Sequence, residues 1–200
     1  MGESLEFLAT AKPGDVVLVT MKSWIHDLVR RGQSAVTPDG QPSRWGHTFL
    51  TGRPREDGQI RIYESDIYFS RSGLKNGAQE NTLAKYSHDD EITHLCIMDF
   101  HLAADEVDRI IAAAQRQISL GLQYPVLELF GTLWAYLTRN FSRPNPLDLE
   151  RASYCSAFVN DCYATVERIV PESVVHPTNV SPEHLYQSDV RDPVRRELLR

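Results

Sequence analysis

The chain has 200 residues, of which 42% are hydrophobic and 24% are charged. A chain of this length can bury a sizeable core without metals or disulfides, so we expect one domain that spans residues 1–200. The net charge of −6 and the scattered basic residues argue against nucleic acid as a partner.

The three cysteines, Cys96, Cys155 and Cys162, lack the regular spacing of a disulfide framework or a zinc site. No histidine pair or acid-rich loop has the spacing of a metal motif, so we expect no metal and no cofactor. The acidic N-terminus does not resemble a Sec signal, and no segment reaches the roughly 18 apolar residues of a membrane-spanning helix. We therefore expect cytoplasmic synthesis, reduced thiols and no transmembrane segment.

The first half of the chain predicts a strand, a helix and a hairpin. Residues 16–20 follow a Pro-Gly-Asp turn and are β-branched or apolar, as in a buried strand. Residues 23–33 have apolar side chains at helical spacing and end in a Gly stop. Residues 45–52 and 58–66 read as strands joined through Asp-Gly, which favours an antiparallel hairpin.

The second half is richer in predicted helix. The polar residues 70–90 predict a surface loop with little regular structure, although its glycines leave a lid open as an alternative. A strand is expected at 92–100 and an amphipathic helix at 103–121. The apolar segment 124–141 also reads as helical. Apolar positions at helical spacing predict a last helix over 155–170, and the fold class is α+β.

The two cysteines of this last helix occupy different positions. A helix N-terminus stabilises a thiolate, because its N–H groups have no intrahelical acceptor and the dipole favours an anion. Cys155 has that position, whereas Cys162 lies two turns further in. We therefore interpret Cys155 as a candidate nucleophile, and Cys162 and Cys96 as core residues.

A nucleophilic cysteine needs a base, normally histidine, and a third group that orients it. His47 interrupts the apolar strand WGHTFLTG, where an imidazole is costly to bury unless it is used or hydrogen-bonded. Glu64 lies on the strand that the hairpin brings alongside, and it could accept the Nδ1 hydrogen of His47. Asp66 shares that face of the strand and is the second choice for the orienting acid.

The order of four segments, KPGDVVLV, WGHTFLTG, IRIYESD and YCSAFVNDCY, resembles the circularly permuted NlpC-like hydrolases of the papain fold. This group includes the YiiX-like proteins and, more distantly, the lecithin–retinol acyltransferases. As in the permuted group, His47 precedes Cys155 in the chain. The resemblance extends from Pro13 to about Ser188.

The resemblance implies a permuted papain-like domain, with an antiparallel sheet packed against helices and the nucleophile at a helix N-terminus. It implies that Cys155 is the nucleophile, His47 the base and Glu64 the orienting residue. Ala157 departs from the family pattern, because glutamate is usual two positions after the cysteine. Tyr154, next to the nucleophile, is a looser candidate that lines the site or stabilises the oxyanion.

The implied activity is cleavage of a peptide or isopeptide bond, such as one in a cell-wall peptide, through a thioester on Cys155. The alternative is a lipid acyl hydrolase or acyltransferase, and the apolar residues 126–137 leave transient membrane contact open as well. Either version is compatible with an antibacterial effector that a dedicated secretion system delivers. A non-catalytic binding domain of the same fold is the third alternative.

Overall fold

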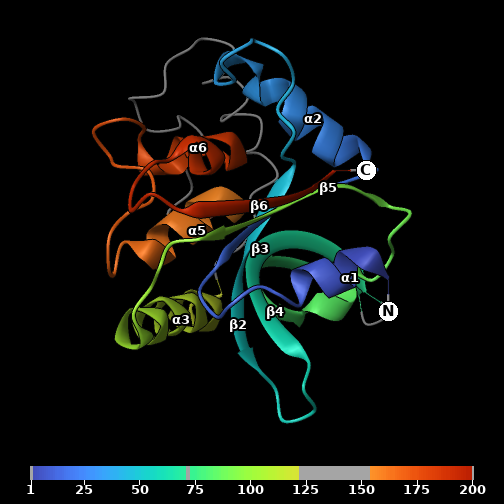
Figure 1. Ribbon diagram of the computed structural model, residues 1–200, viewed down its shortest axis with the longest axis vertical. Helices are drawn as coiled ribbons and strands as arrows, with labels where there is room; N and C mark the ends of the chain where they lie inside the picture. The colour runs from blue at the N-terminus through green and yellow to red at the C-terminus, as the bar shows by residue number, and fades with distance from the viewer. Residues whose placement is uncertain (1, 71–72, 122–153, 200) are drawn as a thin grey trace.

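The computed structural model describes residues 2–70, 73–121 and 154–199 (Figure 1). Its strands are β1 (Val16–Met21), β2 (His47–Pro54), β3 (Ile60–Ser70), β4 (Gly73–Thr82), β5 (Ile92–Asp99) and β6 (Val194–Leu199). Its α-helices are α1 (Glu3–Leu8), α2 (Trp24–Gly32), α3 (Ala104–Ser119), α5 (Cys155–Tyr163) and α6 (Pro182–Gln187). Short 3-10 turns are η1 (Gln33–Ala35), η2 (Leu83–Tyr86) and η3 (Pro177–Asn179).

The strands form one antiparallel sheet in the order β4-β3-β2-β1-β5-β6, so the expected α+β class is confirmed. Both faces of β1 are buried. Val16 and Leu18 pack in one cluster with α3 and α5, whereas Val17 and Val19 pack in a second cluster with α1 and η2. This double burial explains why the strand reads as a continuous apolar run rather than an alternating one.

The predicted hairpin of β2 and β3 is present, with Leu50 opposite Tyr63. The prediction of an irregular loop over residues 70–90 is wrong. β4 pairs with β3 over ten positions, and η2 follows it directly. Because β4 is an edge strand, its side chains need not alternate between polar and apolar, and the hydrophobic pattern does not reveal it.

The last predicted helix is shorter than expected, because α5 ends at Tyr163 rather than near Val170. The buried side chain of Asn160 accounts for the difference. Its Oδ1 accepts the Val170 N–H at 2.8 Å, and its Nδ2 donates to the Val170 carbonyl oxygen at 3.2 Å. The chain therefore folds back beside the helix, and Val166 and Ile169 reach the core without continuing it.

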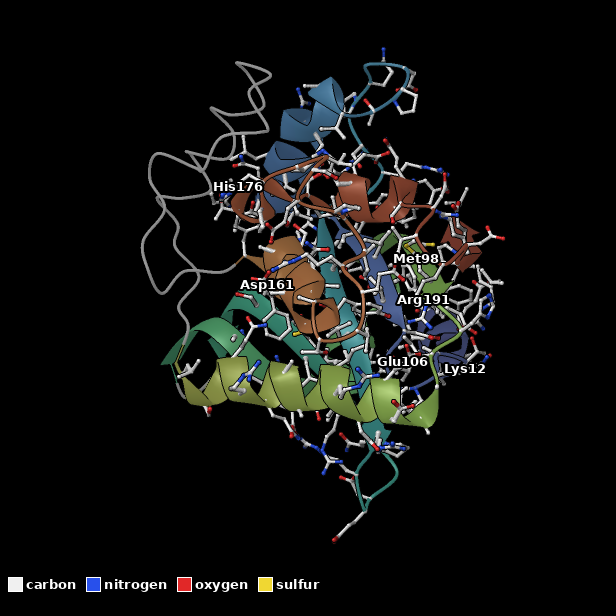
Figure 2. The ribbon with its side chains drawn as sticks, turned by 90° about the vertical axis from the view of Figure 1, so that its left-hand side faces the viewer. Lys12, Met98, Glu106, Asp161, His176 and Arg191 are labelled. Atoms are coloured by element: carbon white, nitrogen blue, oxygen red, sulfur yellow. The ribbon has the colours of Figure 1, made fainter. Side chains whose placement is uncertain are left out.

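The C-terminal part of the chain is tied to α3 by a two-pronged ion pair (Figure 2). Arg191 donates to the two carboxylate oxygens of Glu106 at 2.8 and 2.9 Å. Arg191 and Asp192 have φ angles of 61° and 46°, and this left-handed turn leads into β6. Within the described ranges no helix is long and apolar enough to cross a bilayer. The predicted helix at 124–141 lies outside the described residues.

Candidate active site

The first residue of β2, His47, lies beside Glu64 of β3. Thr51 lies opposite Ile62, and the two-residue period of a strand then places His47 and Glu64 on the same face. His47 Nε2 lies 2.9 Å from Glu64 Oε2. The sequence-based expectation is a bond through Nδ1, but the contact is made through Nε2. Nδ1 is therefore left for a second partner.

Glu64 is buried, with its side chain 0% exposed, and it is surrounded by hydrogen-bond donors. Tyr86 donates to Oε2 at 2.9 Å, while Asn81 Nδ2 and Lys85 Nζ donate to Oε1 at 2.7 and 2.6 Å. Burial alone raises the pKa of Glu64, but Lys85 and His47 outweigh it and hold the pKa well below its usual range. Glu64 is therefore a carboxylate that can orient an imidazolium.

Lys85 joins Glu64 to the second acidic residue, Asp66. Its Nζ lies 2.6 Å from Asp66 Oδ2, the same distance that separates it from Glu64 Oε1. The side chains of Lys85 and Asp66 are 12% and 27% exposed. Asp66, the second choice for the orienting acid, is therefore paired with Lys85, and Glu64 makes the direct bond to His47.

Cys155 is the first residue of α5 and is 4% exposed. The preceding residue, Tyr154, is extended and supplies no side-chain cap to the first N–H groups of the helix. The Cys155 side chain is close enough to His47 to raise the pKa of that histidine. His47 therefore interacts with both the Cys155 thiol and the Glu64 carboxylate, and the three predicted residues come together from α5, β2 and β3.

The environment of His47 favours its protonated form. Burial by itself lowers the pKa of His47, but Asp66, Cys155 and Glu64 raise it, and the pKa is raised to about 10. His47 is therefore an imidazolium at neutral pH, and both of its ring nitrogens are donors. An imidazolium in this position can protonate a departing amine or alcohol.

The other two cysteines have different surroundings. Burial raises the pKa of the Cys96 thiol to about 12, and it raises the pKa of Cys162 even further. Cys162 Sγ accepts a hydrogen bond from Gln117 Nε2 at 3.2 Å, within the core between α3 and α5. Both cysteines are thus protonated core residues at neutral pH.

Tyr154 makes a different contact from the one suggested for it. Its hydroxyl donates to the carbonyl oxygen of Thr178, in η3. A phenol has one hydrogen to donate, so this bond occupies the hydrogen that an oxyanion would require. Tyr154 flanks Cys155 and anchors the start of α5 to η3.

Sequence patterns did not single out His26, which lies on α2 beside His47. The ring centroids are 6.1 Å apart, and His26 Nδ1 accepts the Met21 N–H at 3.0 Å. Burial and the neighbouring His47 lower the pKa of His26 to about 4, so its single proton is on Nε2. The sequence feature connected with His26 is the glycine before His47. A Cβ at Gly46 would lie 2.6 Å from His26 Nδ1, so the glycine leaves room for the His26 ring.

The same cluster has the residue types of a cation site. Ligand atoms of His47, Glu64 and Asp66 lie within 4.8 Å of one another. Lys85 Nζ, however, lies 2.6 Å from both carboxylates and already supplies a positive charge there. A divalent ion would have to displace Lys85 and deprotonate His47, so these residues do not fit a metal well.

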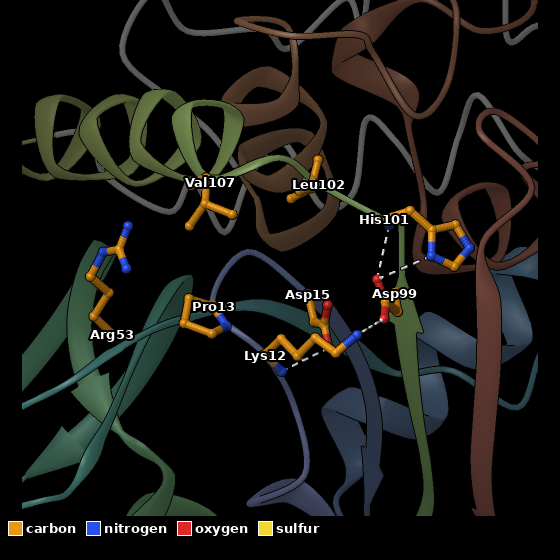
Figure 3. A pocket seen from close by; sticks show the side chains of 9 residues that line it. Lys12, Pro13, Asp15, Arg53, Asp99, His101, Leu102 and Val107 are labelled. Atoms are coloured by element: carbon orange, nitrogen blue, oxygen red, sulfur yellow. Dashed lines mark hydrogen bonds and ion pairs between the residues drawn. The ribbon is translucent and has the colours of Figure 1, made fainter.

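A cavity of about 360 Å³ lies at the opposite end of β1 from His47 (Figure 3). Five of its lining residues have ionisable side chains: Lys12, Asp15, Arg53, Asp99 and His101. Lys12 Nζ bonds to Asp99 Oδ2 at 2.7 Å, and burial raises the pKa of Asp15 to about 6. None of the lining residues is a Cys, Ser or Thr, so this cavity has no thiol or hydroxyl nucleophile.

No model of a known protein family matches the chain, and no curated protein is significantly similar to it in sequence. The functional argument therefore rests on the geometry of the site and on the fold.

Proposed function

We propose that the chain is a cysteine hydrolase of the permuted papain-like class, which cleaves an amide or acyl ester bond through a thioester on Cys155. The observation that carries the proposal is that His47 hydrogen-bonds to Glu64 and also interacts with the Cys155 side chain. This is the order of nucleophile, acid–base partner and orienting carboxylate in a thiol hydrolase.

In the proposed reaction the proton of the Cys155 thiol resides on His47. The sulfur attacks the substrate carbonyl carbon, and N–H groups at the start of α5 stabilise the tetrahedral oxyanion. His47 then protonates the departing amine or alcohol, which leaves the acyl group on Cys155. Neutral His47 then takes a proton from water, which restores the imidazolium. The resulting hydroxide attacks the thioester carbonyl carbon, the C–S bond breaks, and the acid is released from the Cys155 sulfur.

Peptide amides are the first substrate class that we propose. Lipid acyl esters are a second class, and one observation favours them. Trp24, at the start of α2 and two positions before His26, is 76% exposed. An exposed tryptophan close to the site is typical of proteins that contact a lipid interface.

Incubation of the full chain with muropeptides and with phospholipid vesicles, followed by mass spectrometry of the products, separates the two classes. Cleaved peptide with intact lipid supports the amidase, whereas free fatty acid or lysolipid supports the lipid hydrolase. Cys155→Ala should abolish either reaction, because it removes the nucleophile. Cys162→Ala, a matched change in the same helix, should keep it.

The competing binding-domain hypothesis predicts neither product. It also predicts that iodoacetamide does not label Cys155 in preference to Cys96 and Cys162. Both results together would overturn the proposed hydrolase.

A further inference from the structure

The site has two carboxylates, Glu64 and Asp66, and one imidazolium, His47, which can balance the charge of only one of them. Glu64 and Asp66 project from the same face of β3, and their oxygens and a His47 nitrogen lie within 4.8 Å of one another. Two carboxylates this close repel, and because Glu64 is fully buried and the Asp66 side chain only 27% exposed, the repulsion favours a proton on one of them. If Glu64 took up that proton, it would lose its negative charge. His47 would then be held as a neutral hydrogen-bond donor, without a counter-ion for an imidazolium.

Lys85 removes this conflict. Its ammonium lies between the two carboxylates at 2.6 Å from each, with the side chain only 12% exposed. The ammonium also lies 5.3 Å from the centroid of the Tyr86 ring, whose hydroxyl donates to Glu64. The turn η2 therefore supplies both a cation and a neutral donor to the residue that orients His47.

We propose that Lys85 is a positioning residue, which keeps Glu64 and Asp66 ionised together and thereby keeps the Cys155 proton on His47. The two carboxylates that Lys85 binds transmit its effect to His47. The role rests on the proposed thiol chemistry, but it can be measured without a substrate.

Several charged or titratable groups face this cluster, and each belongs to an element packed around it: His47 from β2, Glu64 and Asp66 from β3, Lys85 and Tyr86 from η2, His26 from α2 and Cys155 from α5. His26 stays neutral because burial lowers its pKa to about 4, and burial raises the pKa of Tyr86 well above its usual range. His26 and Tyr86 are therefore both neutral between pH 5 and pH 9 and add no charge to the cluster.

The test is the pH dependence of Cys155 alkylation by iodoacetamide, followed by mass spectrometry of the labelled peptide. Lys85→Met keeps the length of the side chain and removes its charge. We expect the pH midpoint of alkylation to rise by at least about one unit, which corresponds to a roughly tenfold slower reaction below the midpoint. Lys12→Met removes the same kind of ion pair, Lys12–Asp99, at the distant cavity and should leave the midpoint unchanged.

A second variant separates charge balance from folding. Lys85→Met combined with Asp66→Asn removes one cation and one anion, so we expect its midpoint to return to within about half a unit of the wild type. A folded Lys85→Met protein with the wild-type midpoint would show that Lys85 is only structural. If Lys85→Met does not fold, the double variant decides, and a midpoint displaced by a full unit overturns the proposal.

The same experiment distinguishes a failure of the proposed thiol chemistry from a failure of the proposed role of Lys85. If wild-type Cys155 reacts with the pH profile of a free thiol in an unfolded peptide, the thiol chemistry itself is wrong. If the alkylation midpoint of the wild type lies below that of the peptide, and the midpoint of Lys85→Met is the same as that of the wild type, only the role of Lys85 is wrong.

Discussion

At the scale of single residues, the site depends on a close approach between the chain before β2 and the helix α2. Gly46 precedes His47, and a Cβ at Gly46 would lie 2.6 Å from Nδ1 and 2.8 Å from Cβ of His26. Real Cβ atoms do not approach other atoms so closely, so His26 can lie over His47 only because residue 46 has no side chain. The Gly46 N–H also donates to Thr20 Oγ1 at 2.8 Å, which fixes the backbone there.

We expect Gly46→Ala to reduce the free energy of unfolding by about 1–3 kcal/mol, because the added methyl group overpacks the contact with His26. His26→Gly should relieve that clash, because it removes both the ring and the Cβ that the added methyl group would meet. The double variant should therefore be more stable than the two separate losses predict, by about 1 kcal/mol or more. Urea unfolding of the four proteins measures this coupling, and additivity within about 0.5 kcal/mol would contradict the proposed contact.

At the scale of elements, sequence patterns predict the parts of the fold whose side chains form a continuous apolar run, alternate between core and solvent, or repeat at helical spacing. β1, the β2–β3 hairpin, β5 and α3 all carry such patterns, and all are present. β4 is a polar edge strand, and the strand β6 comes from the basic tail RDPVRRELLR, so neither has an apolar period to detect.

The same limit applies to the candidate site. His47, Glu64 and Cys155 were accessible to sequence reasoning because each stands out against an apolar strand or a helix start. Lys85 was not, since only the pairing of β4 with β3 brings η2 to Glu64, and a lysine in a polar stretch reads as a surface residue. Its role follows from long-range pairing, which no local pattern encodes.

The end of α5 is a second element-scale feature, and it can be tested. Asn160→Ala leaves the buried N–H and carbonyl oxygen of Val170 without their partner. Each orphaned group costs about 1–3 kcal/mol, so we expect a loss of about 2–5 kcal/mol in the free energy of unfolding. Glu167→Ala, an exposed change in the same return segment, should cost less than about 0.5 kcal/mol.

Urea unfolding monitored by circular dichroism measures both variants. A loss below about 1 kcal/mol for Asn160→Ala would mean that the return segment is held by its apolar contacts alone, through Val166 and Ile169.

At the scale of the whole molecule, the sheet separates two polar centres. His47 lies opposite Val19 near one end of β1, while Asp15 immediately precedes Val16 at the other end. The candidate site balances its carboxylates with Lys85 and His47, whereas Asp15 is 3% exposed and receives mainly the Lys12 backbone N–H at 2.9 Å. Between about pH 4 and pH 6, Asp15 should therefore add a pH dependence of stability that is separate from that of the site.

Burial raises the pKa of Asp15 from 3.8 to about 6, and the nearby Asp99 adds to the increase. The native protein then binds more protons than the unfolded chain between about pH 4 and pH 6. Stability from this residue is fully present below pH 4 and is lost as the pH rises through about 6. A shift of about two units corresponds to about 3 kcal/mol.

Asp15→Asn keeps an oxygen for the Lys12 N–H but removes the ionisation. We expect the variant to gain stability relative to the wild type by up to about 3 kcal/mol between pH 4 and pH 7, because only the wild type must bury a charge at the higher pH. Urea unfolding of both proteins at pH 4, 5, 6 and 7 measures the difference. A difference that stays constant across this range would mean that Asp15 titrates alike in the native and unfolded states.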